Sequence, residues 1–341
     1  MSAAGLAQGV FLELRAIPVL LWSYTAIVLG TGIAAAETGR FDPWLFAEAL
    51  LIGILIQGFE THSLNEIYDW RSGTDGDPSP RVLSGGSRVL VAGLLKERHL
   101  WAIFAVSSVL AWLLAFDVFL RTGPWVLVFV AMGYFAGLFY TLPPVQTSYR
   151  PFAGEWLGGF LGVATGGLGA YYVQALRISP TAIVVAVAHA CVCVGMLLMH
   201  HYLDAAADER ARPSKRTTIV FLGPRLGKAY ATSFGVVALL AGAVLALTWR
   251  VEASVFAAAA VVGLVAHVRT NPLDVGSVTR RELTVIQSGI VGGVALGVLL
   301  VPALIPMAPI ALVLYVGHVR ASVSLRTPAA DRYESITDPP S

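Results

Sequence analysis

Charged side chains are scarce in this sequence. They make up 13% of the 341 residues, whereas a soluble globular protein has about 25%. Hydrophobic residues reach 56%, and the mean hydropathy is +0.72. This composition excludes a soluble enzyme and a disordered chain.

Cysteine and net charge are also low. The two cysteines, Cys191 and Cys193, stand two positions apart in an apolar run, so on a helix they face different sides and form no useful staple. A disulfide-stapled secreted domain is therefore excluded. A net charge of +2 gives no case for nucleic acid as a partner. The N-terminus lacks a charged segment followed by an apolar run and a cleavage site, so we expect no signal peptide.

Long apolar runs are what the sequence has instead. A membrane span needs about 20 mostly apolar residues, and the chain offers nine such runs. A tenth run, 307–319, is short for a full span, and we expect a half-span or an interfacial helix there. The nine runs are residues 16–36, 44–68, 100–120, 124–141, 153–174, 180–203, 228–249, 252–269 and 282–301.

These runs predict an all-α protein, a multi-pass transmembrane helical bundle of about nine helices. Residues 1–320 form a single transmembrane domain in this prediction, and residues 321–341 form a polar, disordered tail. Basic residues gather between the second and third runs and between the sixth and seventh, whereas the loops on the other face carry one base each. By the positive-inside rule, the N-terminus and the two basic loops face the cytoplasm of a cell membrane.

A short sequence repeat closes two of the runs. Residues 62–69 and 201–208 both read His-x-Leu-(Asn/Asp)-x-x-x-Asp, and they are offset by 139 positions. Each copy ends an apolar run and opens a basic loop. We therefore predict two related halves that face each other across a central cavity.

The repeat places oxygen ligands in pairs. Residues four apart share a helix face, so Asn65 and Asp69 point the same way, as do Asp204 and Asp208. Carboxylates at a membrane boundary repel each other and lose hydration, so they need cations. Hard oxygen ligands without a His/Cys cage favour Mg²⁺, which usually binds one or two carboxylates and a substrate phosphate. Asp75 follows in a stretch whose glycines let the loop fold back over the site.

Each of these features has a plainer alternative. Acids at helix ends are often solvated caps. Two matched pairs, each followed by a basic loop, favour a cation site over that interpretation here. Five nearby bases could pair with diphosphate oxygens, or they could only set the topology. These bases are Arg81, Arg88, Lys96, Lys215 and Arg216.

The residues of the first motif resemble a known family. The run Asn65–Asp75 resembles the first aspartate-rich motif of the UbiA superfamily of intramembrane prenyltransferases, with a spacing most like the menaquinone branch, the dihydroxynaphthoate polyprenyltransferases. The runs 86–95 and 140–172 are also similar to that branch. Asp204-x-x-x-Asp208, followed by Lys215-Arg216-Thr217, resembles the second motif. The resemblance covers roughly residues 10–300.

The resemblance implies about nine helices around a cavity whose active site lies near the cytoplasmic face. It implies that Mg²⁺ on an isoprenyl diphosphate is held by Asn65, Asp69, Asp75, Asp204 and Asp208. Asp69 and Asp204 are then the central catalytic acids. Loss of diphosphate gives an allylic cation, which aromatic faces can stabilise and which a nucleophile captures. The aromatic candidates that we favour are Tyr68, Tyr140 and Tyr149, and Glu155 matches a family position that lines the cavity.

The chain also departs from the menaquinone pattern. His62 replaces an Asn before the first motif, and Glu66 replaces its second Asp. His200 and His201 replace an Asn pair, and Leu203 replaces an Arg, which weakens the case for a carboxylated acceptor. His62 and His201 either serve as catalytic bases or hydrogen-bond to the metal-bound carboxylates.

Three functions remain open from the sequence. The leading one is Mg²⁺-dependent transfer of a prenyl group from an isoprenyl diphosphate to an aromatic or quinone-precursor acceptor. The second is a terpene cyclase of the same superfamily, which needs no acceptor. A cation transporter is less fitting, because the acids gather at helix ends rather than at the midplane.

Overall fold

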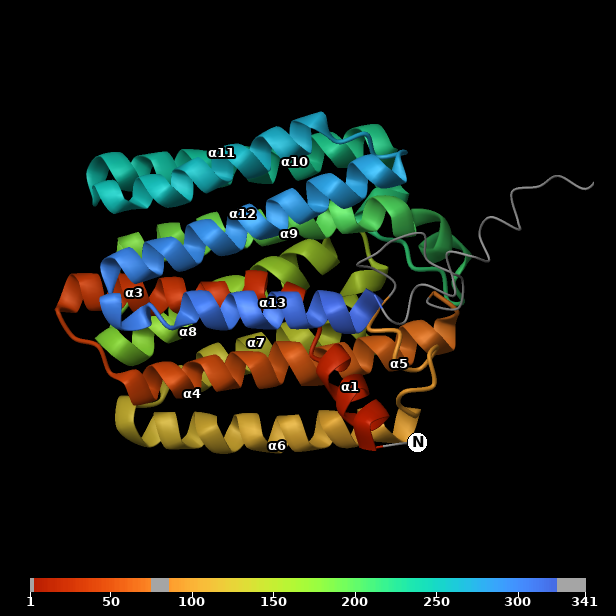
Figure 1. Cartoon of the computed structure of the whole chain (residues 1–341), viewed down its shortest axis with the longest axis horizontal. Helices are drawn as coiled ribbons and strands as arrows, with labels where there is room; N and C mark the ends of the chain where they lie inside the picture. Colours follow the sequence, from red (N-terminus) through yellow and green to blue (C-terminus); the bar gives the residue numbers. More distant parts are fainter. Residues whose placement is uncertain (1–2, 75–85, 324–341) are drawn as a thin grey trace, which may run out of the picture.

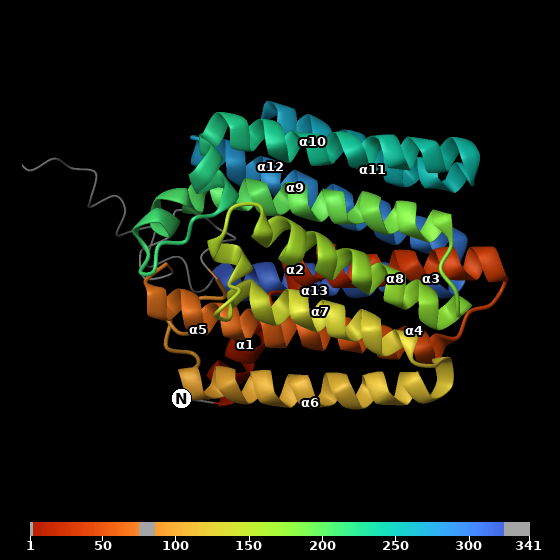
Figure 2. The same ribbon diagram turned by 180° about the vertical axis from the view of Figure 1, so that it is seen from behind.

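The computed structural model describes residues 3–74 and 86–323, and within them the chain forms helices, turns and no strand. The long helices run along one common direction and form an elongated bundle (Figure 1). A view from behind shows the same alignment for α7, α8 and α9 (Figure 2). Helices satisfy their own backbone hydrogen bonds, which is what a span surrounded by lipid requires. The predicted all-α membrane bundle is therefore confirmed.

The expected runs all fall in helices. Three of these runs contain a π-helical turn next to their α-helical segments, and these turns are labelled η1, η2 and η4. The first half of the chain comprises α1 (Ala3–Glu13), α2 (Ala16–Val19), η1 (Leu20–Tyr24), α3 (Thr25–Thr38), α4 (Pro43–Gly53), η2 (Ile54–Thr61), α5 (His62–Ser72), α6 (Glu97–Thr122), α7 (Trp125–Thr141), η4 (Gly154–Phe160) and α8 (Leu161–Ala175). The second half comprises α9 (Pro180–Arg210), α10 (Thr218–Thr248), α11 (Ser254–Arg269), α12 (Val275–Leu300) and α13 (Met307–Val323).

Eight of the described helical stretches are long and apolar enough to cross a membrane. The tenth run is longer than the sequence predicted, because a 3₁₀ turn precedes α13 and the two together span Pro302–Val323, or 22 residues. The tail that we expected from residue 321 is helical as far as Val323, and its remaining residues lie outside the described part.

Local chemistry explains several helix ends. Asp42 accepts hydrogen bonds from the backbone N–H groups of Trp44 and Leu45, and Pro43 occupies the first turn of α4. Ser179 caps α9 in the same way, with Pro180 in its first turn. Helix α5 ends at Gly73, directly after the first motif. Gly73 has a φ of 81°, a left-handed conformation that residues with a side chain rarely adopt.

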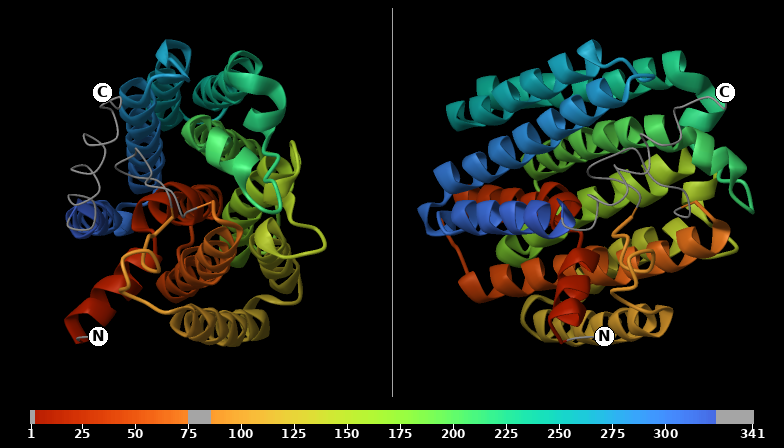
Figure 3. Two further views of the ribbon diagram at one scale, coloured as in Figure 1. Left: turned by 90° about the vertical axis from the view of Figure 1, so that its right-hand side faces the viewer. Right: turned by 45° about the vertical axis from the view of Figure 1, so that its right-hand side comes forward.

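The packing places α3 at the centre of the bundle. The end-on view in Figure 3 shows this red helix surrounded by the other layers. The stretch that contains α3 is the most buried of the candidate spans, and α9 follows it, whereas α6 and α13 expose most of their residues. The end of α9 and helix α5 lie at the same end of the bundle (Figure 1). The two copies of the repeat are thereby brought to one end of the molecule.

Candidate active site

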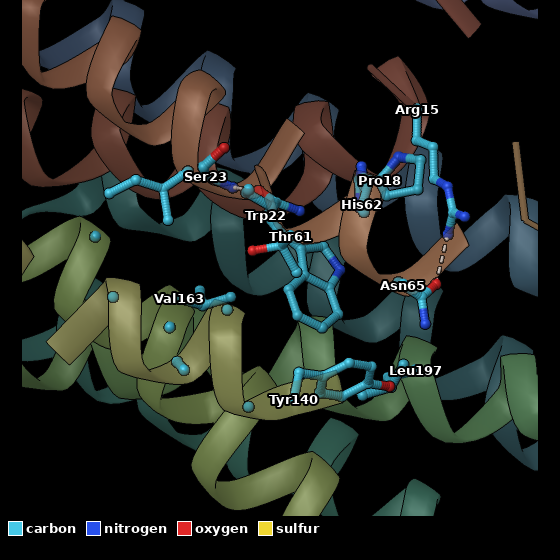
Figure 4. Close-up of a pocket in the computed structure, with 18 of the residues that line it drawn as sticks. Arg15, Pro18, Trp22, Ser23, Thr61, His62, Asn65, Tyr140, Val163 and Leu197 are labelled. Atoms are coloured by element: carbon cyan, nitrogen blue, oxygen red, sulfur yellow. Dashed lines mark hydrogen bonds between the residues drawn. The ribbon is translucent and has the colours of Figure 1, made fainter. Parts of the chain in front are cut away.

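A cavity of about 600 Å³ lies inside the bundle, as the repeat predicted. Asn65 and Asp69 from α5 line it together with Asp204 and Asp208 from α9. All three π-helical turns also border it, through residues such as Trp22, Gln57 and Gly158. Such turns often occur at functional sites. Figure 4 shows Trp22, Thr61, Asn65 and Tyr140 around this space.

The first motif is ordered by two hydrogen bonds. The Asn65 Nδ2 amide donates to Asp69 Oδ2 at 2.8 Å, one turn further along α5. Arg15 Nη1 donates to Asn65 Oδ1 at 3.0 Å, which Figure 4 marks with a dashed line. The spacing of four residues thus gives the shared helix face that the sequence predicted.

Behind this motif lies a buried polar network that Arg15 connects to the cavity wall. Arg15 Nη2 pairs with Glu66 Oε2 at 2.8 Å, and the backbone N–H of Ser87 donates to the same oxygen at 2.8 Å. The Ser87 hydroxyl donates to Glu13 Oε2 at 2.6 Å. The network fastens α1 and the segment that follows residue 85 onto α5. Glu66, which replaces an aspartate of the family motif, therefore serves this network.

Lys215 connects the loop after α9 to the first motif. Its Nζ atom lies 3.2 and 3.1 Å from the two oxygens of Asp69, and 5.7 Å from the centre of the Tyr149 ring. Burial alone would lower the pKa of Lys215, but the carboxylates of Asp69 and Asp208 raise the pKa well above its usual value. Lys215 is therefore a buried, permanently charged ammonium between the two motifs.

The second motif is contacted from α12. His200 Nδ1 lies 2.7 Å from Glu282 Oε1, and His200 Nε2 lies 3.8 Å from Asp204 Oδ2. Asp208 is buried, and its backbone carbonyl accepts a hydrogen bond from the Lys215 N–H at 2.8 Å. His200, Asp204, Asp208 and Glu282 all line the cavity.

The donor set suits a hard divalent cation. Within residues 3–74 and 86–323, no three or more His, Cys, Asp or Glu side chains gather closely enough to form a cage. The oxygen donors instead form two separate pairs that face one cavity. This is the pattern that Mg²⁺ uses when a substrate phosphate and water complete its shell, so the residues fit Mg²⁺.

The other residues that the sequence nominated are placed unevenly. Tyr140, His62 and His201 line the cavity with the two motifs. Tyr149 lies behind Lys215, and the buried Glu155 accepts from the Thr218 hydroxyl at 2.8 Å. Neither Tyr149 nor Glu155 lines the cavity, so the expectation that Glu155 lines it was wrong. Other described residues that do not line the cavity are Tyr68, Arg88, Lys96 and Arg216. Asp75 and Arg81 lie outside the described residues.

The structure adds site residues that sequence reasoning missed. Arg15 and Trp22 line the cavity from the first helical stretch, and Glu282 and His318 line it from α12 and α13. Arg15 and Glu282 did carry a signal, since each is a charged residue at the end of an apolar run. Trp22 and His318 carried none, because only packing brings them to the cavity.

The apolar part of the cavity extends away from the motifs between α4, α7 and α8. Its far end is lined by the buried side chains of Val118, Val126 and Val173. Along α7 and the η4–α8 stretch the wall carries several glycines: Gly133, Gly137, Gly158, Gly162, Gly166 and Gly169. A methyl group added at Gly166 would meet no atom within 4 Å. We call this part the apolar arm.

Substitution of Lys215 tests the electrostatics of the site. Lys215→Met is expected to lower the free energy of unfolding by about 3 kcal/mol, because Asp69 stays buried without its cation. A raised pKa keeps the stabilising charge at every pH below the usual lysine value, so the loss should be equal at pH 7 and pH 9. Thermal unfolding in detergent with EDTA measures it. Lys228→Met is the control, and an equal loss in both variants would refute the assignment.

The model of the UbiA prenyltransferase family matches residues 24–283. The chain belongs to the UbiA prenyltransferase family. With its apolar helices, this makes the chain a multi-pass membrane protein. No curated protein matches it significantly. The match does not assign the chain to the menaquinone branch, which stays a prediction.

Solved structures of UbiA homologues have the same fold. A homologue from Archaeoglobus fulgidus bound to GPP and Mg²⁺ aligns with a TM-score of 0.65 and 15% identity, over 84% of this chain and 99% of that one. A UbiA homologue from the same organism bound to DMAPP and Mg²⁺ gives a TM-score of 0.61 and 16% identity, over 82% of this chain and 97% of that one. A homologue from Aeropyrum pernix K1 gives 0.61 and 15%, over 83% and 96%. At this identity the likeness concerns the fold.

Two parts of the cavity wall lie outside the UbiA family match. Arg15 and Trp22 precede residue 24, and His318 on α13 follows residue 283. Helix α13 packs against α1, α2 and α12, and Gln8 donates to the Ala321 carbonyl at 3.4 Å. The N-terminal helices and α13 thus close the cavity beside the first motif.

Proposed function

We propose that this UbiA-family protein is a Mg²⁺-dependent prenyltransferase that ionises an isoprenyl diphosphate inside the membrane. One observation carries the proposal: two acidic motifs and a buried lysine occupy one end of a cavity whose remaining length is mainly apolar. A diphosphate ester of a hydrocarbon chain has the same division into a charged head and an apolar tail. The homologue structures with GPP or DMAPP and Mg²⁺ support this donor class.

The residues have separate roles in the proposed reaction. The two acidic motifs, with Asp75 from the loop, would hold Mg²⁺, which when bound neutralises charge on the leaving diphosphate. The Lys215 ammonium adds positive charge beside Asp69. Arg15 keeps Asn65 in place. The basic loops, including Arg81, would face the cytoplasm with the N-terminus, so that the charged head enters from that side.

The walls of the cavity suit an allylic cation. In Figure 4, Trp22 and Tyr140 project into the space from opposite walls, one from η1 and the other from α7. Aromatic faces attract cations by about 0.5–2 kcal/mol, more when water is excluded. The surrounding apolar residues exclude bulk water, which would otherwise capture the cation. Both features support carbocation chemistry at this end of the apolar arm.

The length of the apolar arm supports a donor of about four isoprene units. Val126 at its far end and Tyr140 near the motifs are 14 residues apart on α7. At the rise of an α-helix this separation is about 21 Å. An extended isoprene unit contributes four chain bonds, or about 5 Å. We therefore propose that the preferred donor carries about 20 carbons.

The acceptor in our leading proposal is an aromatic or quinone-precursor compound. A terpene cyclase is the second candidate, and Leu203 favours it. This residue lines the cavity at the position where the menaquinone pattern has an arginine, so the wall offers no cation there for a carboxylated acceptor. A cyclase needs none, because a double bond of the substrate acts as the nucleophile.

Pyrophosphate release from purified protein in detergent tests the proposal. With Mg²⁺ and a panel of C10 to C25 allylic diphosphates, turnover is expected to stop on addition of EDTA and to return with excess Mg²⁺. Mass spectrometry of the organic phase identifies the product. Turnover that requires a naphthoate or phenolic acceptor supports the transferase, and a cyclic hydrocarbon formed without acceptor supports the cyclase. Full turnover in EDTA would refute the metal-dependent mechanism.

A further inference from the structure

Glu282 is a buried acid on the cavity wall that the proposed reaction does not use. Its side chain is 4% exposed and lies near the start of α12, opposite the end of α9. An acid at the end of a membrane helix costs free energy unless a partner satisfies it. His200 is such a partner, because its Nδ1 atom lies 2.7 Å from Glu282 Oε1.

The contact orients the imidazole ring. Glu282 Oε1 lies within hydrogen-bond distance of Nδ1, and this fixes the direction in which the ring of His200 points. The other nitrogen, Nε2, then faces Asp204 Oδ2 at 3.8 Å, one helical turn further along α9. Glu282, His200 and Asp204 therefore form a line from α12 to the second acidic motif, and all three border the cavity.

The two motifs are thus supported differently. On α5, Asp69 is held directly by Asn65 and Lys215. On α9, His200 Nε2 lies 3.8 Å from the Asp204 carboxylate. Partners that hold a metal-ligating side chain from behind typically change metal affinity by 10–100-fold when they are removed.

We propose that Glu282 and His200 are positioning residues that hold Asp204 in the orientation that binds the divalent cation. Glu282 acts through His200, because its carboxylate contacts the imidazole on the side away from Asp204. The inference rests on the proposed function, which makes Asp204 a metal ligand. This proposal gives Glu282 and His200 a role, because packing between α9 and α12 does not by itself require an acid and a histidine.

Direct binding of Mn²⁺ tests this role without turnover. Free Mn²⁺ is measured by electron paramagnetic resonance on the full-length protein in detergent with inorganic pyrophosphate present. Glu282→Ala and His200→Ala are each expected to weaken binding by 10–100-fold. The double variant should bind no more weakly than His200→Ala alone, because the two residues act as one unit. Glu282→Gln keeps an acceptor oxygen and should stay within a few-fold of the wild type.

Gln287→Ala is the matched control, since Gln287 also lies on α12 and donates to the Tyr315 hydroxyl at 2.9 Å, away from the cavity. It should bind Mn²⁺ like the wild type. In turnover, Glu282→Ala should raise the Mg²⁺ concentration for half-maximal rate by the same factor, with kcat at saturating Mg²⁺ within a few-fold. If Glu282 only joined two helices, its replacement would lower thermal stability without raising the Mg²⁺ concentration needed for half-maximal rate.

Two outcomes overturn the inference in different ways. If Asp204→Ala weakens Mn²⁺ binding but Glu282→Ala and His200→Ala do not, the positioning role is wrong and the metal site stands. If Asp204→Ala binds Mn²⁺ as tightly as the wild type, the metal assignment of the proposed function fails, and the inference fails with it. Should Glu282→Ala not fold, His200→Asn serves instead, because the shorter side chain cannot contact both carboxylates.

Discussion

Asp69→Asn and Asp204→Asn are each expected to lower the rate of pyrophosphate release by about 10²–10³-fold. Each change removes one negative charge from an oxygen pair that faces the cavity, while the amide keeps the size of the side chain. The charge that develops on the departing diphosphate is then compensated less. Asparagine is preferred to alanine at position 69, because it can still contact Asn65 and Lys215.

The measurement compares initial rates at saturating donor and Mg²⁺ with the elution profile and thermal unfolding of each variant. Asp117→Asn is the matched control. Asp117 is a largely exposed acid near the C-terminal end of α6, where it pairs with Arg121. The control should retain wild-type turnover. Normal turnover in either cavity variant would show that the carboxylate is not part of the metal site.

The sequence was sufficient for the helices and for the two motifs. An apolar run long enough to span a membrane has to satisfy its own backbone hydrogen bonds, which a helix does. Every predicted run is helical in the structure. The spacing of four residues put Asn65 beside Asp69 because it is a property of the α-helix itself. The offset copy at residues 201–208 was brought to the same cavity, as the repeat predicted.

Contacts between distant residues could not be predicted in this way. Lys215 and Asp69 are 146 positions apart, Glu282 and His200 are 82 apart, and Arg15 and Asn65 are 50 apart. No local pattern distinguished Lys215, which is buried against Asp69, from Arg216, which is exposed. The choice depends on how the loop after α9 closes onto α5, and tertiary packing determines that closure.

The shape of the cavity could not be predicted from the sequence either. Glycines at 158, 162 and 166 recur every four residues, a spacing that equally suits close packing between helices. In the structure they line the apolar arm, and Gly166 faces open space. A methyl group added at Gly158 would meet Tyr140 at 2.5 Å, so that glycine does allow close packing, whereas Gly166 leaves room for a ligand.

Gly166→Phe is expected to shorten the donor that the protein accepts. Gly166 lies eight residues from Gly158 along the η4–α8 stretch, or about 12 Å from the end of the arm near Tyr140. A Cβ atom there meets no other atom within 4 Å, and we expect the phenyl ring to occupy the volume of the third and fourth isoprene units. The remaining length, at about 5 Å per unit, accommodates two units.

The rate ratio between C20 and C10 diphosphates should therefore fall by at least about 100-fold in Gly166→Phe. A buried methylene contributes about 0.8 kcal/mol, so the loss of contact with a few carbons already reaches this factor. Competition between the two donors, followed by mass spectrometry, measures the ratio directly. Val128→Phe is the control, because Val128 is exposed on α7 and the added ring stays outside the cavity. An unchanged ratio in Gly166→Phe would mean that the prenyl chain leaves the motifs by another path.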